Sequence, residues 1–199
     1  MATNTESVDL VGDETVANIA RAALFAALMG AFAYVSFPNP LAAGVPITLQ
    51  VLGVFLAGIM LGPVWGAIAM VLYLVAGAIG APVFSGGAAG IGHLIASPTL
   101  GFLWSYPIAA AAVGLVVHRG VGLTEYKSAS TPTLVGAMVL GTAIIYALGT
   151  VGFAAIQYDP WYASLGQAFV VSSLPFIPVE AVKIAAAVGI VKSDAIAAA

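Results

Sequence analysis

Charged side chains are too scarce in this sequence to cover a folded chain of its length with a solvated surface. Only 7% of the 199 residues are charged and 62% are hydrophobic, whereas a soluble domain carries about 25% charged residues. The solvent around most of the chain is therefore expected to be apolar. A membrane-spanning helix needs about 20 apolar residues, so the length has room for one compact membrane bundle and no second domain.

Proline and glycine divide the apolar sequence into segments that each fit a helix. Proline cannot continue the hydrogen-bond ladder of a helix but suits its first turn, as at Pro63 after Gly62 and at Pro98 after Ser97. We therefore expect an all-α, polytopic membrane protein with six transmembrane helices in a compact bundle. The predicted spans are residues 17–36, 48–61, 63–79, 98–117, 131–156 and 178–191.

Two segments between the spans, residues 37–47 and 80–98, carry several glycines and prolines and almost no charge. Irregular backbone at membrane depth is tolerated only where protein covers it, so both are expected to be re-entrant-like outer loops. Residues 161–174 are apolar but short for a span and predict an interfacial or re-entrant piece. The predicted units are a disordered acidic head at 1–16, a single six-helix membrane domain at 17–192 and a short tail at 193–199.

The positive charges predict the orientation in the membrane. With six spans, Arg21, Arg119, Lys127 and Lys192 all fall on the side of the two termini, and the opposite loops contain no Lys or Arg. Because short cytoplasmic loops carry an excess of Lys and Arg, both termini are expected to be cytoplasmic in a multi-pass protein of the cell membrane. A span at residues 161–174 would give seven helices and place Lys192 outside, so the charge rule favours six.

One charged pair lies inside the last predicted span. Lys183 stands five residues after Pro178, about 7 Å along the helix, and Glu180 shares its helical face three residues earlier. Charged groups at membrane depth cost about 2.5–3.5 kcal/mol each. Either the two side chains neutralise one another or snorkel to the outer interface, or they bind a ligand from outside. If they bind a ligand, the lysine holds its carboxylate and the glutamate accepts hydrogen bonds from its N–H groups.

Other polar, aromatic and small residues leave two interpretations open. Gln50, near the outer end of the second span, either bonds to backbone or lines a pocket. Small residues four apart on the first span make a smooth stripe, which serves either packing within the bundle or docking of a partner. These are Ala22 with Ala26 and Ala23 with Ala27. The aromatic residues Tyr73, Trp104, Tyr106 and Tyr146 are interpreted as bundle or interface residues.

The sequence lacks the motifs of the common enzyme classes. It has no phosphate-binding G-x-x-x-x-G-K-[ST] loop, no H-E-x-x-H helix and no cysteine. Ser85 and His93 are not part of a G-x-S-x-G elbow. We therefore expect no enzymatic activity, no metal site and no cofactor, and the five scattered Lys and Arg residues argue against nucleic acid as a partner.

Four stretches of the sequence resemble the BioY family, the biotin-binding subunits of energy-coupling-factor (ECF) transporters. They are VPITLQVLGVFLAG at 45–58, GAIGAPVFSGGAAGIGHL at 77–94, SPTLGF at 97–102 and LPFIPVEAVK at 174–183. The resemblance covers about 170 residues. It implies a six-helix bundle that binds biotin at its outer face and docks, through the small residues of its first helix, on a transmembrane scaffold (T) component with two ABC-type ATPase subunits. In such transporters the loaded subunit topples within the membrane to release its ligand inside.

The chain departs from the family pattern at the last helix, where relatives usually have P-G-D-x-x-K. Here Pro178, Val179, Glu180 and Lys183 stand at those positions, and Gly86 stands where relatives often have asparagine.

The resemblance implies a binding site for biotin as the transported ligand, entered between the two glycine-rich outer loops. Glu180 accepts hydrogen bonds from the ureido N–H groups, and Lys183 neutralises either Glu180 or the valerate carboxylate. Two alternatives are a subunit for another vitamin or a biotin precursor, and a non-transporting membrane scaffold or assembly protein. The implied site consists of Thr48, Gln50, Phe84, Ser85, Gly86, Ile91, Glu180 and Lys183.

Overall fold

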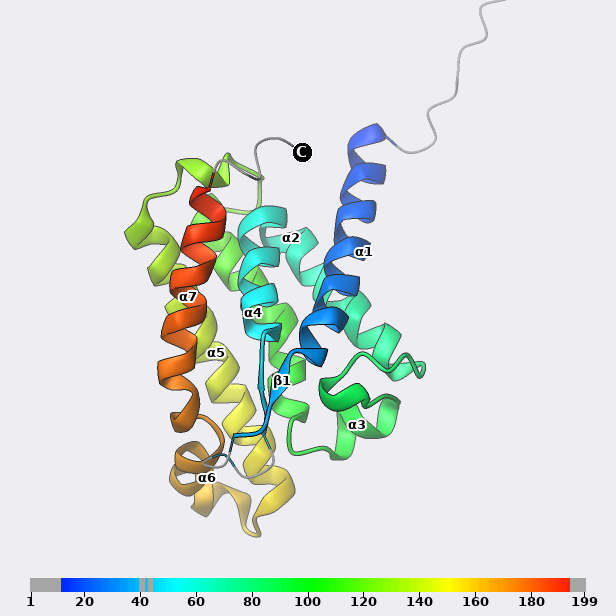
Figure 1. Ribbon diagram of the computed structural model, residues 1–199, viewed down its shortest axis with the longest axis vertical. Helices are drawn as coiled ribbons and strands as arrows, with labels where there is room; N and C mark the ends of the chain where they lie inside the picture. The colour runs from blue at the N-terminus through cyan, green and yellow to red at the C-terminus, as the bar shows by residue number, and fades with distance from the viewer. Residues whose placement is uncertain (1–11, 40–41, 43–44, 194–199) are drawn as a thin grey trace, which may run out of the picture.

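Long helices running side by side form the body of the protein (Figure 1). The computed structural model describes residues 12–39, 42 and 45–193. Its long helices are α1 (Asp13–Tyr34), α2 (Gln50–Ala78), α4 (Leu100–His118), α5 (Thr131–Gln157) and α7 (Ile177–Lys192). Within the described residues, five helical segments are long and apolar enough to cross a membrane: Glu14–Tyr34, Gln50–Ala78, Leu100–His118, Thr131–Gln157 and Trp161–Lys192. The predicted all-α fold class is confirmed.

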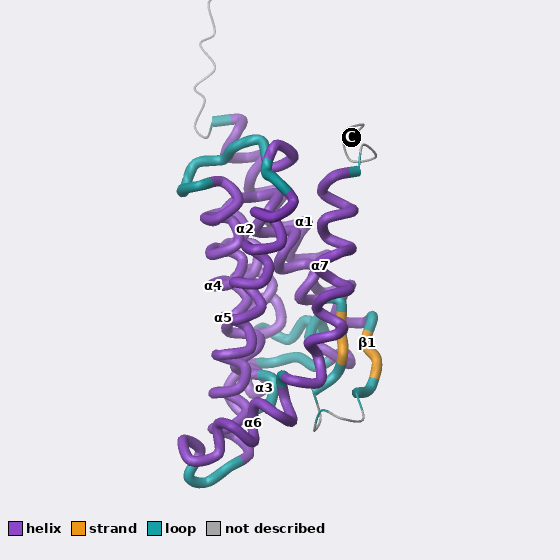
Figure 2. The backbone as a smooth tube through the Cα atoms, turned by 90° about the vertical axis from the view of Figure 1, so that its left-hand side faces the viewer, coloured by secondary structure: helices purple, strands orange, loops and turns teal. Residues whose placement is uncertain are grey.

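Short elements gather mainly at one end of the bundle, opposite the start of α1 and the end of α7 (Figure 2). A small antiparallel ladder pairs Ser36 with Thr48 and Phe37 with Ile47. At the other end, the 3₁₀ turn η2 (Tyr126–Ser128) joins α4 to α5. The remaining short elements are β1 (Ser36–Phe37), β2 (Ile47–Thr48), η1 (Ser85–Gly87), α3 (Ile91–Ala96), η3 (Trp161–Ser164), α6 (Leu165–Ser172) and η4 (Leu174–Phe176).

The helix α2 reverses direction at Gly62. This residue has φ 75° and ψ −177° inside the helix, a combination that is essentially restricted to glycine. A Cβ on Gly66 would lie 2.9 Å from the carbonyl oxygen of Ala57, although nine residues of continuous helix span about 13.5 Å. The limbs 50–61 and 63–78 therefore pack against each other, and the break predicted at Gly62-Pro63 is confirmed.

Polar contacts hold the end of the bundle that carries the positive charges. Ser130 caps α5 by accepting a hydrogen bond from the Thr133 N–H. In the last turn of α7, Lys192 donates from Nζ to the carbonyls of Lys127 and Ala129, at 2.7 and 2.6 Å. A cation at this position also interacts favourably with the helix dipole. Lys192 thus ties the connection between α4 and α5 to the end of α7.

The structure differs from the prediction in two places. The helix α1 begins at Asp13 rather than at residue 17, so residues 13–16 are helical and not part of a disordered head; residues 1–11 and 194–199 lie outside the described part of the chain. The predicted outer loop at 80–98 is not irregular throughout, because Ile91–Ala96 forms the short helix α3. The glycines that predicted irregular backbone lie before α3, except for Gly92 within it.

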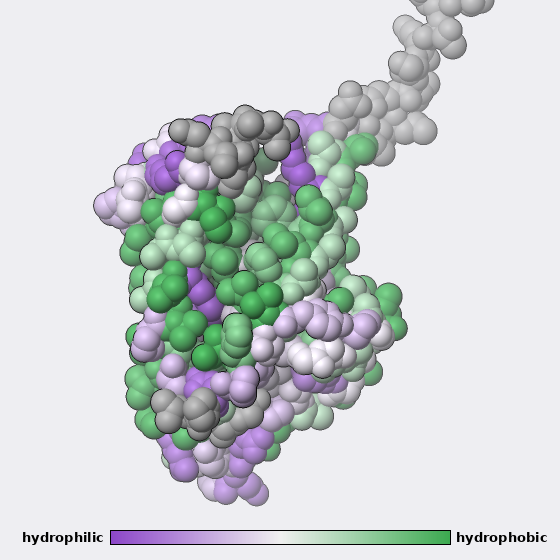
Figure 3. Space-filling view, viewed as in Figure 1, coloured by the Kyte–Doolittle hydropathy of each residue, from purple (hydrophilic) through white to green (hydrophobic). Residues whose placement is uncertain are grey.

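Apolar side chains cover the middle of the visible face, and hydrophilic ones gather mostly towards the two ends (Figure 3). Along the helix α7, apolar side chains face outwards and charged ones face the bundle. Ile177 and Val182 are exposed, whereas Glu180 and Lys183 are buried. An apolar exterior with charge turned inwards is the arrangement expected of a helix in lipid.

Candidate functional site

The charged pair on α7 is buried within the bundle. Glu180 and Lys183 are 3% and 5% exposed, and Lys183 Nζ donates to Glu180 Oε1 over 2.7 Å. The spacing of three residues places both side chains on one helical face, and Pro178 in the first turn fixes where that face begins. Burial excludes snorkelling to the interface, because the pair lies among protein side chains.

The pair lines a cavity at the end of the bundle that carries the short elements. The cavity, called here the inner cavity, has a volume of about 50 Å³. That is room for a few water molecules, so a vitamin-sized ligand requires the surrounding walls to move apart. It is lined by Val45, Pro46, Thr48, Gln50, Val51, Ser85, His93, Thr99, Phe102, Leu103, Tyr106, Ile145, Tyr146, Phe176, Glu180 and Lys183.

A hydrogen-bonded cluster around Gln50 forms one wall of the inner cavity. The Gln50 amide oxygen accepts from Thr48 Oγ1 at 3.0 Å and from Ser85 Oγ at 3.1 Å. Its amide nitrogen donates to the Tyr73 hydroxyl at 2.5 Å, and that hydroxyl donates to the Val83 carbonyl at 3.1 Å. The cluster joins β2 and both limbs of α2 to the segment before η1. Gln50 therefore lines a pocket, and its side-chain amide bonds to other side chains rather than to backbone.

An aromatic stack supports this wall from behind. Phe84 is fully buried, packs edge-on against Tyr73 with ring centroids 5.6 Å apart, and stacks on His93 at 5.2 Å. Gly77 makes room for the Phe84 ring, because a Cβ there would overlap it. His93 Nε2 lies 3.2 Å from Thr99 Oγ1, and partial burial lowers the pKa of His93 below its usual range. The histidine is therefore neutral at pH 7 and presents a polar edge to the cavity.

A second, wider space of about 440 Å³, the outer cavity, adjoins the first and shares Val45, Pro46 and Ser85 with it. Gly86 lines this space in a left-handed conformation, with φ 70° and ψ 16°. Asparagine tolerates that conformation better than most residues, and nothing lies within 4 Å of the position of a Cβ there. A glycine at this position therefore keeps the turn and omits only a side chain.

The structure brings five of the eight implied site residues together on the inner cavity: Thr48, Gln50, Ser85, Glu180 and Lys183. Gly86 lies on the outer cavity. Phe84 is not among the lining residues, because its ring is turned towards Gly77 and Tyr73. Ile91 is 58% exposed on α3 and also lies outside the lining, since the helix turns it away from the bundle.

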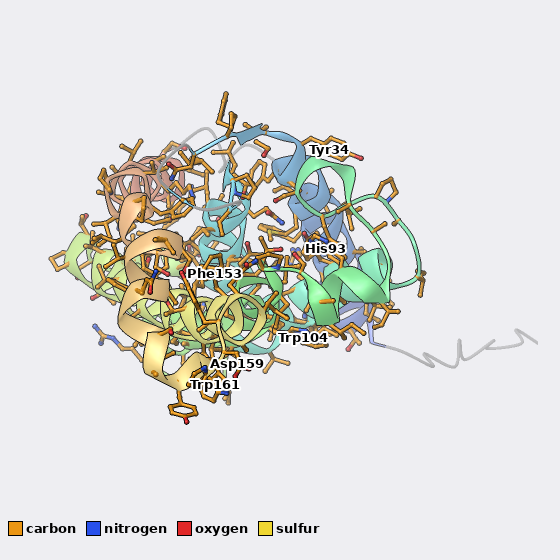
Figure 4. The ribbon with its side chains drawn as sticks, turned by 90° about the horizontal axis from the view of Figure 1, so that it is seen from below. Tyr34, His93, Trp104, Phe153, Asp159 and Trp161 are labelled. Carbon is orange, nitrogen blue, oxygen red and sulfur yellow. The ribbon has the colours of Figure 1, made fainter. Side chains whose placement is uncertain are left out.

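Sequence reasoning missed several lining residues, of which Tyr106 and Tyr146 were interpreted as bundle aromatics. At the start of α4, the N-cap Thr99 and the helical residues Phe102 and Tyr106 recur at helical spacing on the face that lines the cavity. That periodicity was a usable signal, but it does not distinguish a cavity wall from ordinary packing. The sequence around His93, which lacks a G-x-S-x-G elbow, gave no sign that this residue lines the cavity. Viewed from this end of the bundle, it lies towards the middle, whereas Tyr34, Trp104 and Trp161 lie at the rim (Figure 4).

The two small-residue stripes of α1 face in different directions. Ala22 is fully buried and Ala26 partly buried, in contact with the rest of the bundle. Ala23 and Ala27 are exposed. Internal packing therefore accounts for the first stripe, and the second is free for a partner. The described residues contain no group of three or more His, Cys, Asp or Glu side chains arranged to hold a metal ion.

Comparison with known proteins identifies close relatives. The model of the BioY family matches residues 3–198. A protein of Rhodobacter capsulatus named biotin transporter BioY is 41% identical over 172 residues, which cover 84% of this chain and 87% of the relative. A probable biotin transporter BioY of Pyrococcus horikoshii is 36% identical over 167 residues, covering 83% and 88%. The crystal structure of the S-component for biotin from an ECF-type ABC transporter superposes with a TM-score of 0.76 over 92% of this chain and 93% of the other, at 22% identity, and establishes a shared fold.

Proposed function

The chain belongs to the BioY family, and on that premise we propose that it binds biotin and takes it up as the substrate-specific subunit of an ATP-driven ECF transporter. It is a multi-pass membrane protein and a transporter subunit rather than an enzyme. The observation that carries the proposal is the ion pair of Glu180 and Lys183, buried on the wall of a largely apolar cavity. Such a pocket, apolar with a few placed polar groups, is typical of small-molecule sites.

The chemistry of the cavity suits a ligand with a polar ring and a carboxylate. Glu180 Oε1 is held by Lys183, so its second oxygen is available to ring N–H groups. Phe102, Leu103 and Phe176 offer apolar surface to the fused rings. Biotin enters through the outer cavity, and the walls of the inner cavity separate to admit it.

We further propose six membrane crossings with both termini in the cytoplasm. The reversal at Gly62 supports counting the limbs 50–61 and 63–78 as separate crossings. With α6 as an outer piece before α7, the total is six. The end of α4, the turn η2 and the end of α7 lie at the end opposite the cavities (Figure 1). These segments carry Arg119, Lys127 and Lys192, which supports a cytoplasmic position for that end and an outward-facing site in the cell membrane.

The proposed partners are a transmembrane T component and two ABC-type ATPase subunits. The chain has no phosphate-binding loop of its own, so the energy for uptake has to come from another subunit. The exposed stripe of Ala23 and Ala27 is the proposed contact with the T component, because small side chains let another helix approach closely.

Equilibrium binding of labelled biotin to the purified protein in detergent tests this function. We expect saturable binding that unlabelled biotin displaces. Displacement by a different vitamin or by a biotin precursor, but not by biotin, would support a subunit for that compound. A folded protein that binds no small molecule would refute the proposal and favour a scaffold or assembly role.

A further inference from the structure

Two buried polar atoms on the inner cavity lack a hydrogen-bond partner. Among the described residues, the Tyr146 hydroxyl and Glu180 Oε2 are the buried side-chain oxygen or nitrogen atoms without one. Tyr146 and Glu180 are 8% and 3% exposed, and both line the inner cavity. Buried polar groups are nearly always hydrogen-bonded, so each unpaired one requires an explanation. Their presence on one cavity points to a bound molecule that supplies the partners.

The hydrogen-bonded cluster around Gln50 on the cavity wall is already engaged. Gln50, Thr48, Ser85 and Tyr73 bond to one another and to backbone. A ligand that used these groups would have to break existing hydrogen bonds. The two unpaired atoms are free of that penalty.

The two unpaired atoms differ in chemistry. A carboxylate oxygen only accepts hydrogen bonds, whereas a phenol O–H also donates one. Glu180 comes from α7 and Tyr146 from α5, and both line the inner cavity. Together they match a molecule that presents an N–H donor beside a carbonyl acceptor, as a cyclic urea does.

We propose that Tyr146 is a specificity-determining residue of the site, whose hydroxyl donates a hydrogen bond to the ureido carbonyl oxygen of biotin while Glu180 Oε2 accepts from a ureido N–H. The assignment of Tyr146 rests on the proposed function. It gives the site a reason to prefer a urea ring over a ring that lacks the carbonyl oxygen.

The substitution Tyr146→Phe separates a binding role from a structural one by the sign of its effects. In the ligand-free protein the hydroxyl has no partner, so its removal breaks no hydrogen bond and keeps or raises the melting temperature. In the complex, the same change leaves the ligand carbonyl unpaired and weakens binding about tenfold. A hydroxyl that held the fold together would instead lower the melting temperature of the ligand-free protein.

The experiment measures melting temperature and affinity for wild type, Tyr146→Phe and the control Tyr162→Phe, which makes the same chemical change at a residue that is 65% exposed on η3. The ligands are biotin and its thio analogue, in which sulfur, a much weaker hydrogen-bond acceptor, replaces the ring carbonyl oxygen. We expect Tyr146→Phe to lose about tenfold in affinity for biotin but not for the analogue, and the control to match wild type with both.

Affinity for biotin within twofold of wild type, or an equal loss for both ligands, would overturn the role of Tyr146. A wild-type protein that binds no biotin would overturn the proposed function itself, which is a different result.

Discussion

The ion pair on α7 can be tested by removing one partner at a time. Lys183→Met keeps an unbranched side chain, one atom shorter, but leaves the carboxylate of Glu180 unpaired at 3% exposure. At the observed 2.7 Å and an effective dielectric constant of about 20, the attraction between two unit charges is about 6 kcal/mol. Part of this is offset because the lysine no longer has to be desolvated. Breaking a buried pair in this way typically costs about 3–5 kcal/mol, and we expect a loss of stability in that range.

The double variant Glu180→Gln with Lys183→Met provides the matched control. It buries no ion, so its stability should return to within about 1 kcal/mol of wild type or exceed it. Thermal unfolding of wild type, both single variants and the double variant in the same detergent gives the coupling energy between the two side chains. Additive effects of the two substitutions, or a Lys183→Met variant as stable as wild type, would refute the view that the pair is held in an apolar setting.

Binding separates the structural role of the pair from its role towards the ligand. Truncating one member of a desolvated charge pair at a binding site costs at least about 2 kcal/mol, so Lys183→Met should weaken biotin binding about thirtyfold or more. The double variant should be stable and still bind weakly. Recovery of full affinity together with stability would show that the pair serves the fold and not the ligand.

Three further predictions concern residues other than the pair. His118 is buried, and its ring bonds to the Ile59 carbonyl and the Thr124 N–H, both at 2.9 Å. The substitution His118→Ala should therefore lower the unfolding free energy by about 2–4 kcal/mol, as measured by chemical unfolding. An unchanged free energy of unfolding would contradict these bonds. Gly77→Ala should push the Phe84 ring out of place, cost about 1–3 kcal/mol and weaken biotin binding, whereas unchanged affinity would mean that this wall does not shape the site. Because burial depresses the pKa of His93 below 6.5, its contribution to stability is present above that pH and lost as the pH falls below it. The wild-type melting temperature should accordingly drop more between pH 8 and pH 5 than that of His93→Gln, and parallel pH profiles would refute this.

Much of the architecture followed from local sequence signals. The scarcity of charge predicted a membrane protein, and proline and glycine placed most helix boundaries close to their observed positions, including the reversal at Gly62. Start signals were weaker at α1, where residues 13–16, three of them polar, gave no apolar period and yet belong to the helix. Helix propensity and capping act over a few residues, so they can be found from sequence alone.

The sequence by itself determined that Glu180 and Lys183 share a helical face at membrane depth, because helical geometry fixes neighbours three residues apart. Only the tertiary structure decided what stands opposite them. Gln50, Tyr106 and Tyr146 reach the same cavity from α2, α4 and α5, and no spacing along the chain encodes that meeting. It arises from how helices pack across long sequence separations, where burial and shape select the neighbours. For the same reason Phe84, which its sequence neighbourhood placed in the site, lies behind the wall, since Gly77 leaves a space there that its ring fills.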